Sequence, residues 1–200
     1  MTGFLDKVYD ARDAASTRTL YDDWSATYEA EVAANGYATP GRCADALAQV
    51  IPEKIMPILD FGCGTGLSGL ALKLAGFAVL DGVDLSEDML KGAAEKGVYR
   101  TLSTIEADDP IPPGYSIYAA IGVIGAGAAP ISVLHDIMRA LPVGGHFVFS
   151  FNDHALEDPS NEGAIAEWTD CGAARLVFKE YGDHLPGINL KSNVYILEKT

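Results

Sequence analysis

Three glycines alternate with small residues in the stretch Ile58-Leu-Asp-Phe-Gly-Cys-Gly-Thr-Gly66. An apolar run, Met56 to Phe61, precedes the glycines, and a segment with helical apolar spacing, Leu67 to Ala75, follows them. Glycine lets the backbone turn tightly after a strand and lets a ligand approach a helix N-terminus without meeting a Cβ atom. This strand, loop and helix predict a chain folded around a nucleotide-binding α/β core.

Strand-like and helix-like segments alternate along the rest of the chain. We expect strands at Phe77–Asp84, Tyr99–Ile105, Tyr115–Ile124 and His146–Phe151, and helices after the N-cap Ser86 and over Ala129–Leu141 and Glu162–Cys171. Two β-rich segments, Ala174–Tyr181 and Ser192–Glu198, joined through residues 182–187, predict an antiparallel hairpin. The expected fold is therefore α/β, a doubly wound, mostly parallel seven-stranded sheet with a C-terminal antiparallel hairpin.

The N-terminal segment is predicted to be helical. Arg12 to Tyr28 lacks Gly and Pro, its aromatic residues recur every three or four positions, and Cys43 to Val50 has apolar residues on one helical face. No linker, repeat or low-complexity tract interrupts the sequence. We expect a single domain over residues 1–200, with residues 1–51 as a helical cap.

Composition excludes several classes of protein. A formal net charge of −14, from 28 acidic and 14 basic residues, argues against a nucleic-acid substrate. No apolar run reaches the roughly 18 residues of a membrane span, and the N-terminus lacks a signal-peptide pattern, so we expect a cytoplasmic protein with no membrane partner. The cysteines at 43, 63 and 171 have no metal-ligand or disulfide spacing, so no metal site is expected.

An acidic residue, Asp84, ends the second predicted strand 18 positions after Gly66. A carboxylate there can accept hydrogen bonds from both hydroxyls of a ribose. The loop itself has G-x-G-x-G spacing, which differs from the G-x-G-x-x-G pattern of dinucleotide sites, and Asp60 before its first glycine would repel a diphosphate. Together these features favour an adenosine-containing ligand that carries positive charge.

The motifs resemble those of class I S-adenosylmethionine-dependent methyltransferases, which have a Rossmann-like fold. Leu59-Asp-Phe-Gly-Cys-Gly-Thr-Gly66 resembles the first family motif, and Gly82-Val-Asp-Leu-Ser-Glu-Asp-Met-Leu90 resembles the second. Tyr21-Asp-Asp-Trp-Ser-Ala-Thr-Tyr28 resembles the branch that acts on small molecules. The whole chain is similar to the Williams-Beuren syndrome region methyltransferase-like group.

The resemblance implies a site for S-adenosylmethionine in which the loop holds the methionine end, Asp84 the ribose, and the third strand's end the adenine. The residues implied to contact it are Asp60, Gly62, Cys63, Gly64, Gly66, Asp84, Leu85, Ile105, Glu106, Ile121, Tyr21 and Tyr28. Asp108 is an alternative to Glu106 as the acid that receives the adenine amino group. Tyr21 and Tyr28 either close over the methionine end or only pack a cap helix on the core. The family's acid at the start of the fourth strand is missing, because Tyr115-Ser116 stands there.

These features predict methyl transfer to a small molecule, whose identity no motif encodes, by a monomer or homodimer. If the acceptor must lose a proton, His154, in the loop expected after the fifth strand, is the candidate base, although a histidine there can also cap a turn. The alternative is a non-catalytic protein that binds S-adenosylmethionine as a sensor or scaffold. An NAD-dependent oxidoreductase is disfavoured by the loop spacing and by the lack of a Tyr-x-x-x-Lys motif.

Overall fold

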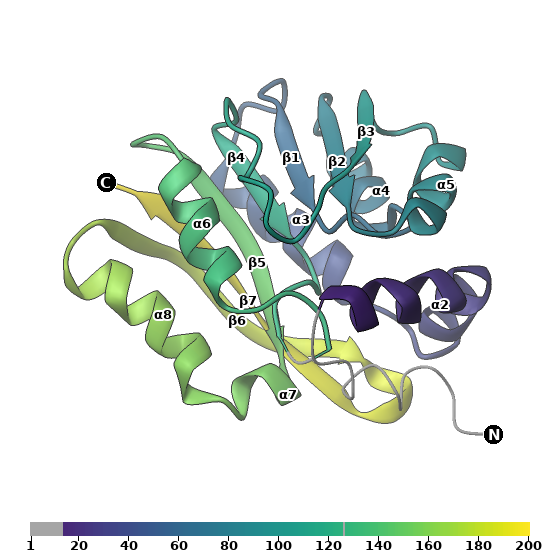
Figure 1. Cartoon of the computed structure of the whole chain (residues 1–200). Helices are drawn as coiled ribbons and strands as arrows, with labels where there is room; N and C mark the ends of the chain where they lie inside the picture. The colour runs from purple at the N-terminus through teal and green to yellow at the C-terminus, as the bar shows by residue number, and fades with distance from the viewer. Residues whose placement is uncertain (1–13, 126) are drawn as a thin grey trace.

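The computed structural model describes residues 14–125 and 127–200, so the predicted helix start at Arg12 lies outside the described residues. Helices and strands alternate through most of this part of the chain (Figure 1). The helices are α2 (Ala14–Ala34), α3 (Thr39–Val50), α4 (Leu67–Leu74), α5 (Glu87–Glu95), α6 (Ser132–Ala140), α7 (Asp153–Leu156), α8 (Pro159–Asp170) and the short 3-10 turn η2 (Pro186–Ile188). The strands are β1 (Ile58–Phe61), β2 (Leu80–Asp84), β3 (Thr101–Thr104), β4 (Ile117–Ala120), β5 (His146–Asn152), β6 (Ala174–Leu185) and β7 (Leu190–Lys199).

The strands form one seven-stranded sheet in the order β3-β2-β1-β4-β5-β7-β6. The first five of these are parallel, whereas β7 pairs antiparallel with both β5 and β6. The predicted fold class and C-terminal hairpin are therefore confirmed. The strand order reverses between β1 and β4, and ligands of open α/β sheets bind beyond the carboxyl ends of the strands at such a point.

Helices cover both faces of the sheet, with α3 and α4 on one side and α6 and α8 on the other. Alternate strand residues serve the two faces, because successive side chains of a strand point in opposite directions. Thus Ile58 packs with Leu47 of α3 and Leu72 of α4, whereas Leu59 packs with Leu134 of α6. The central strands β1, β4 and β5 bury both faces, which explains their continuous apolar runs in the sequence.

Several strands are shorter than their apolar runs predicted, because burial does not require strand pairing. Phe77 is fully buried in the core, yet β2 begins only at Leu80. Tyr99 lies before β3 because its side chain reaches under the glycine loop, and Tyr115 lies before β4, where its hydroxyl donates to Asp81 over 2.9 Å. The sequence pattern therefore located the strands but overestimated the lengths of β1 to β4.

The C-terminal third differs most from expectation. β6 continues through Leu185, so the connection of the hairpin is residues 186–189 and not 182–187. The expected loop after the fifth strand is helical, because the Asn152 side chain accepts a hydrogen bond from the Ala155 amide and caps α7. The Asp158 side chain caps α8 in the same way, which moves its start to Pro159.

The two N-terminal helices have different environments. α2 lies beyond the carboxyl ends of β1 and β2, whereas α3 packs into the core through Cys43 and Leu47 (Figure 1). Of the expected cap over residues 1–51, α2 thus lies over the strand ends, whereas α3 is part of the core. No helix of residues 14–125 and 127–200 combines the length and apolar character needed to cross a bilayer.

Candidate functional site

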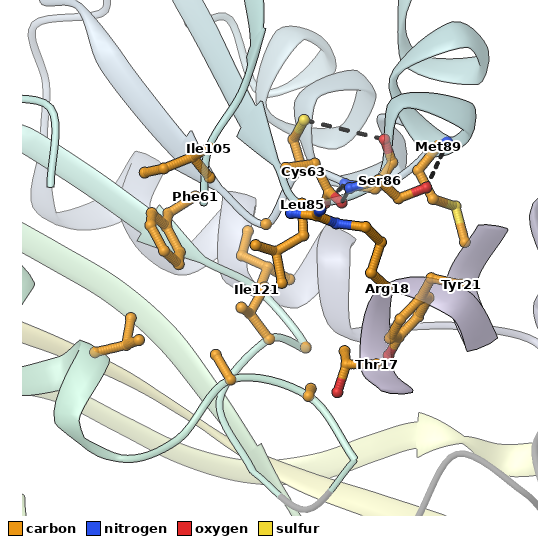
Figure 2. A pocket seen from close by; sticks show the side chains of 18 of the residues that line it. Thr17, Arg18, Tyr21, Phe61, Cys63, Leu85, Ser86, Met89, Ile105 and Ile121 are labelled. Atoms are coloured by element: carbon orange, nitrogen blue, oxygen red, sulfur yellow. Dashed lines mark hydrogen bonds between the residues drawn. The ribbon is translucent and has the colours of Figure 1, made fainter. Parts of the chain in front are cut away.

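A cavity of about 730 Å³ opens at the carboxyl ends of β1, β2 and β4, on the far side of which lies α2. Figure 2 shows Arg18 reaching from α2 toward Leu85 on the opposite wall. The predicted residues that line it are Tyr21, Tyr28, Gly62, Cys63, Gly64, Asp84, Leu85, Ile105, Glu106 and Ile121. Asp60, Gly66 and His154 do not line it.

The glycine loop needs its glycines for two different reasons. Gly62, Gly64 and Gly66 all have positive φ, at 69°, 53° and 89°, a conformation that costs other residues about 1–2 kcal/mol. A Cβ atom on Gly62 would lie 2.6 Å from Cγ2 of Val123, whereas one on Gly64 would have nothing within 4 Å. The loop is therefore tightly packed at its first glycine and open to the cavity at its second.

Asp84 closes the loop from the neighbouring strand. Its Oδ2 accepts from the Gly64 amide at 2.8 Å, and its Oδ1 accepts from the Ser86 amide at 2.9 Å. Burial raises the pKa of this carboxyl, while the amide hydrogen bonds act to lower it. A carboxylate has about four lone-pair sites, so these two bonds leave capacity for the two hydroxyls of a ribose.

Asp60 lies behind the loop and is fully buried. Its Oδ2 accepts hydrogen bonds from Ser68 and Tyr99, each at 2.6 Å, whereas its Oδ1 has no hydrogen-bond partner among the described residues. Burial raises the pKa of this carboxyl to about 6, and the two hydrogen bonds only partly oppose that effect. Asp60 thus acts on the cavity through Ser68, which does line it, and not by direct contact.

The wall between β2 and β3 has the character expected for a purine site. Leu85 and Ile105 supply apolar surface, and both Glu106 and Asp108 line the cavity beside them. Glu106 is engaged by Arg18, whose Nη2 lies 2.5 Å from Oε2. Both acids are therefore within the site, and Glu106 and Asp108 remain alternative partners for an adenine amino group.

Polar contacts fasten α2 to both ends of α5 and to the segment after β3. Besides the pair between Arg18 and Glu106, the Ser86 hydroxyl donates to Asp22, and Lys96 forms an ion pair with Glu29. Residues 18, 22 and 29 share one helical face, since they are four and seven positions apart. These contacts were not predicted, because each joins residues more than 60 positions apart.

The aromatic residues of α2 form the other face of the helix. Trp24 is 2% exposed and lies between Tyr21 and Tyr28, with ring centroids 5.7 and 4.8 Å away. Tyr21 and Tyr28 also line the cavity, so they both pack the helix and form part of the cavity wall. Burial raises the pKa of the Tyr28 phenol, which keeps this hydroxyl protonated.

Two further predicted residues, Cys63 and Ile121, form apolar parts of the cavity wall. Cys63 is 3% exposed, and burial raises the pKa of its thiol well above the usual value, so it is a packing residue of the loop. Ile121, 6% exposed, follows β4, and the next residue, Gly122, leaves room for the hydroxyl of Tyr37, which would lie 2.3 Å from a Cβ atom there. Tyr37 and Gly122 line the cavity and were not predicted.

His154, the predicted base, lies in α7 with its side chain 42% exposed, and its Nδ1 is 4.0 Å from Oε1 of Glu157. This position is outside the cavity lining, so the geometry gives the predicted role no direct support. A different histidine, His184 of β6, is 7% exposed and lies near the α2 aromatic residues. In the part of the chain described, no cluster of three His, Cys, Asp or Glu residues could hold a metal ion.

The residues present fit the ligand that the motifs imply. The open space at Gly64 admits a ligand against bare backbone, the Asp84 carboxylate has free acceptor capacity, and Leu85 with Ile105 gives an apolar slot. The unpartnered Oδ1 of Asp60 adds negative character behind the loop. These features suit an adenosine group joined to a positively charged tail.

Comparison with known proteins agrees with this geometry. Residues 58–113 match the model of a methyltransferase domain. The human methyltransferase-like protein 27 is 33% identical over 138 residues, which cover 66% of this chain and 56% of that protein. The chain therefore spans little more than half the length of this relative.

Solved structures share the fold at lower sequence identity. The [4+2]-cyclase SpnF superimposes with a TM-score of 0.68 at 14% identity, covering 94% of this chain and 97% of that one. An S-adenosylmethionine-dependent methyltransferase from Thiobacillus denitrificans, solved with S-adenosyl-L-homocysteine, gives a TM-score of 0.58 at 13% identity, covering 80% and 91%. The two motifs, the matched domain over residues 58–113 and the fold together support a class I S-adenosylmethionine-dependent methyltransferase.

Proposed function

We propose that the cavity binds S-adenosylmethionine and that the protein transfers its methyl group to a small molecule. One observation carries the proposal: the glycine loop, the Asp84 carboxylate and the apolar slot beside Ile105 all line a single cavity of about 730 Å³. This volume lies within the range of about 300–1,000 Å³ that small-molecule sites occupy.

Each part of the cavity has a role in this proposal. Asp84 accepts hydrogen bonds from the ribose hydroxyls, and Leu85 and Ile105 contact the adenine. Gly62 and Gly64 present backbone to the methionine end, and Tyr21 and Tyr28 close that end from α2. Either Glu106 or Asp108 receives the adenine amino group. Asp60 stabilises the positive charge of the donor from behind the loop.

Methyl transfer requires mainly that the protein position the two reactants and exclude water from them. A lone pair of the acceptor forms the new bond to the methyl carbon, the bond between that carbon and sulfur breaks, and its electron pair leaves sulfur neutral. An acceptor that carries a proton releases it to water or to a base. His154 stays a prediction as that base, and unchanged turnover in His154→Ala with an identified acceptor would remove it.

A small acceptor is supported by charge and by the walls of the site. The net charge of −14 would repel an RNA or DNA backbone, and aromatic side chains of α2, Tyr21 and Tyr28, line the cavity. Cys43, Cys63 and Cys171 are free thiols. Free thiols fit a reducing compartment, so the proposal includes a cytoplasmic protein, as a monomer or a homodimer.

Calorimetric titration of the purified protein with S-adenosylmethionine, S-adenosylhomocysteine and NAD tests the ligand. We expect binding of the first two and none of NAD, and a preference for NAD would overturn the proposal. Incubation with isotope-labelled donor and separated fractions of a cell extract then tests the acceptor. Label in the small-molecule fraction is expected; label in RNA would contradict the acceptor class. Tight binding with no labelled product in any fraction would instead favour the sensor or scaffold alternative.

A further inference from the structure

A second, smaller cavity of about 70 Å³ adjoins the main one. Tyr21, Tyr28, Tyr37 and Gly122 line both cavities, so the smaller one lies directly behind the methionine end of the proposed donor site. Its far wall comes from β5 and β6, and no Asp, Glu, Lys or Arg lines it within the described residues. This is a mostly aromatic chamber with a few neutral polar groups.

His184 of β6 is a buried polar residue on the far wall of this chamber. Its ring meets the Tyr37 ring edge-on, with centroids 5.1 Å apart, and its Nδ1 lies 2.8 Å from Oγ1 of Thr39. Its Nε2 has no hydrogen bond to any described residue. Burial lowers the pKa of His184 to about 4, so the imidazole is neutral near neutral pH.

A chain of hydrogen bonds decides which ring nitrogen carries the proton. Arg42 donates to Oγ of Ser192 at 3.1 Å, Ser192 Oγ lies 3.0 Å from Oγ1 of Thr39, and Thr39 contacts His184. Because Arg42 can only donate, the fully satisfied arrangement runs in one direction: Ser192 donates to Thr39, and Thr39 donates to Nδ1 of His184.

The opposite direction would leave the Ser192 hydroxyl proton without an acceptor, and this side chain is fully buried. An unsatisfied buried donor is strongly unfavourable, because it loses its hydrogen bonds to water without replacement. The neutral His184 ring therefore carries its proton on Nε2, which makes Nε2 a hydrogen-bond donor.

We propose that the His184 Nε2–H group binds an uncharged oxygen atom, a carbonyl or hydroxyl, of the methyl acceptor in the smaller cavity. This inference rests on the proposed function and narrows it. A cationic acceptor would meet no carboxylate in the chamber, and an anionic one would have no cation to pair with. The acceptor is thus a small neutral molecule with an apolar body and an oxygen function, and His184 determines specificity for that oxygen.

Two substitutions separate this role from a structural one. The amide oxygen of asparagine can take the place of Nδ1 of histidine and accept from the Thr39 hydroxyl, so His184→Asn can keep this contact but lacks a donor at Nε2. The amide nitrogen of glutamine overlays Nε2, so His184→Gln keeps the donor and loses the contact to Thr39. If His184 only supports the fold, His184→Asn should replace it better than His184→Gln. If His184 binds the acceptor oxygen, His184→Gln should replace it better.

The test uses full-length protein and phenol as the probe, with toluene as the isosteric control that lacks the oxygen. NMR of protein labelled at histidine nitrogen, with and without S-adenosylhomocysteine, should show neutral His184 protonated at Nε2, and phenol should shift that nitrogen while toluene does not. We expect His184→Asn to weaken phenol binding about 3- to 10-fold and His184→Gln to retain it, the range for one neutral hydrogen bond.

A proton on Nδ1 would overturn the proposal, and so would equal phenol affinity of His184→Asn and wild type. The tautomer measurement needs no variant, so it holds even where a substitution prevents folding. Calorimetry of S-adenosylhomocysteine on the wild type reports separately on the proposed function. If that ligand fails to bind while phenol still shifts His184, the donor site is wrong and the smaller cavity remains a binding site.

Discussion

The two walls of the main cavity are built differently. The loop wall is made of backbone and of side chains close in sequence: Gly64 and Asp84 are 20 residues apart, and Ser86 and Asp84 only two. The α2 wall is held by side chains of distant segments, such as Arg18 with Glu106, 88 residues apart. A ligand common to a whole family can be held by the first kind of wall, while a ligand particular to one member depends on the second.

The largest expected effect concerns the loop wall, where two glycine variants should differ in their free energy of unfolding. Gly62→Ala combines a positive φ with a Cβ contact of 2.6 Å to Val123, so we expect a loss of about 3–4 kcal/mol in the free energy of unfolding. Gly64→Ala has the same φ problem but open space, so it should cost only about 1–2 kcal/mol. Urea denaturation measures both, and equal losses would show that the packing of the loop does not distinguish its glycines.

The pH dependence of unfolding tests the contribution of Asp60, which lies buried behind the loop wall. Its folded pKa of about 6 lies above the ordinary value of 3.8, so between those values the folded state holds a proton that the unfolded chain releases. Stability should therefore fall as the pH rises through this window, by about 3 kcal/mol at most, and Asp60→Asn should remove that part of the fall. The exposed Glu53→Gln variant is the control, and matching pH profiles for wild type and Asp60→Asn would contradict the expectation.

Donor affinity tests the loop wall directly. Asp84→Ala removes a carboxylate that anchors the Gly64 amide and faces the cavity, and should weaken S-adenosylmethionine binding by about 2 kcal/mol, or roughly 30-fold. Calorimetry on this variant and on Asp88→Ala, an exposed acid of α5, gives the comparison. Equal affinities of the two variants would mean that Asp84 does not hold the ribose.

The smallest effect is expected on the α2 wall. Arg18→Ala removes an exposed ion pair that links α2 to the end of β3, and should speed the release of S-adenosylhomocysteine about two- to fivefold with little change in folding. Lys91→Ala removes a similarly exposed pair with Asp88, within one helix, and should leave release unchanged. Stopped-flow displacement measures the rates, and identical effects of the two substitutions would show that the Arg18 contact does not restrain α2.

Local, periodic features of the sequence predicted the sheet, its hairpin and most of the loop wall. The place of Asp60 behind the loop also had a signal: it shares a strand face with Ile58, which packs against α3 and α4, so its side chain points toward Ser68 of α4. His184 had no such signal, because its partner Thr39 lies 145 residues away and only the fold brings them together. For this reason, sequence patterns predicted the loop wall but gave no indication of the smaller cavity around His184.

The three polar contacts of α2 have a consequence for the timing of the reaction. Arg18, Asp22 and Glu29 connect the helix to its neighbours through charged groups, two of them in ion pairs that water reaches. Such pairs weaken as dissolved ions screen them, over a distance of about 8 Å at physiological ionic strength. We therefore expect exchange of ligands to quicken as salt is added, while the affinity of the loop wall changes little.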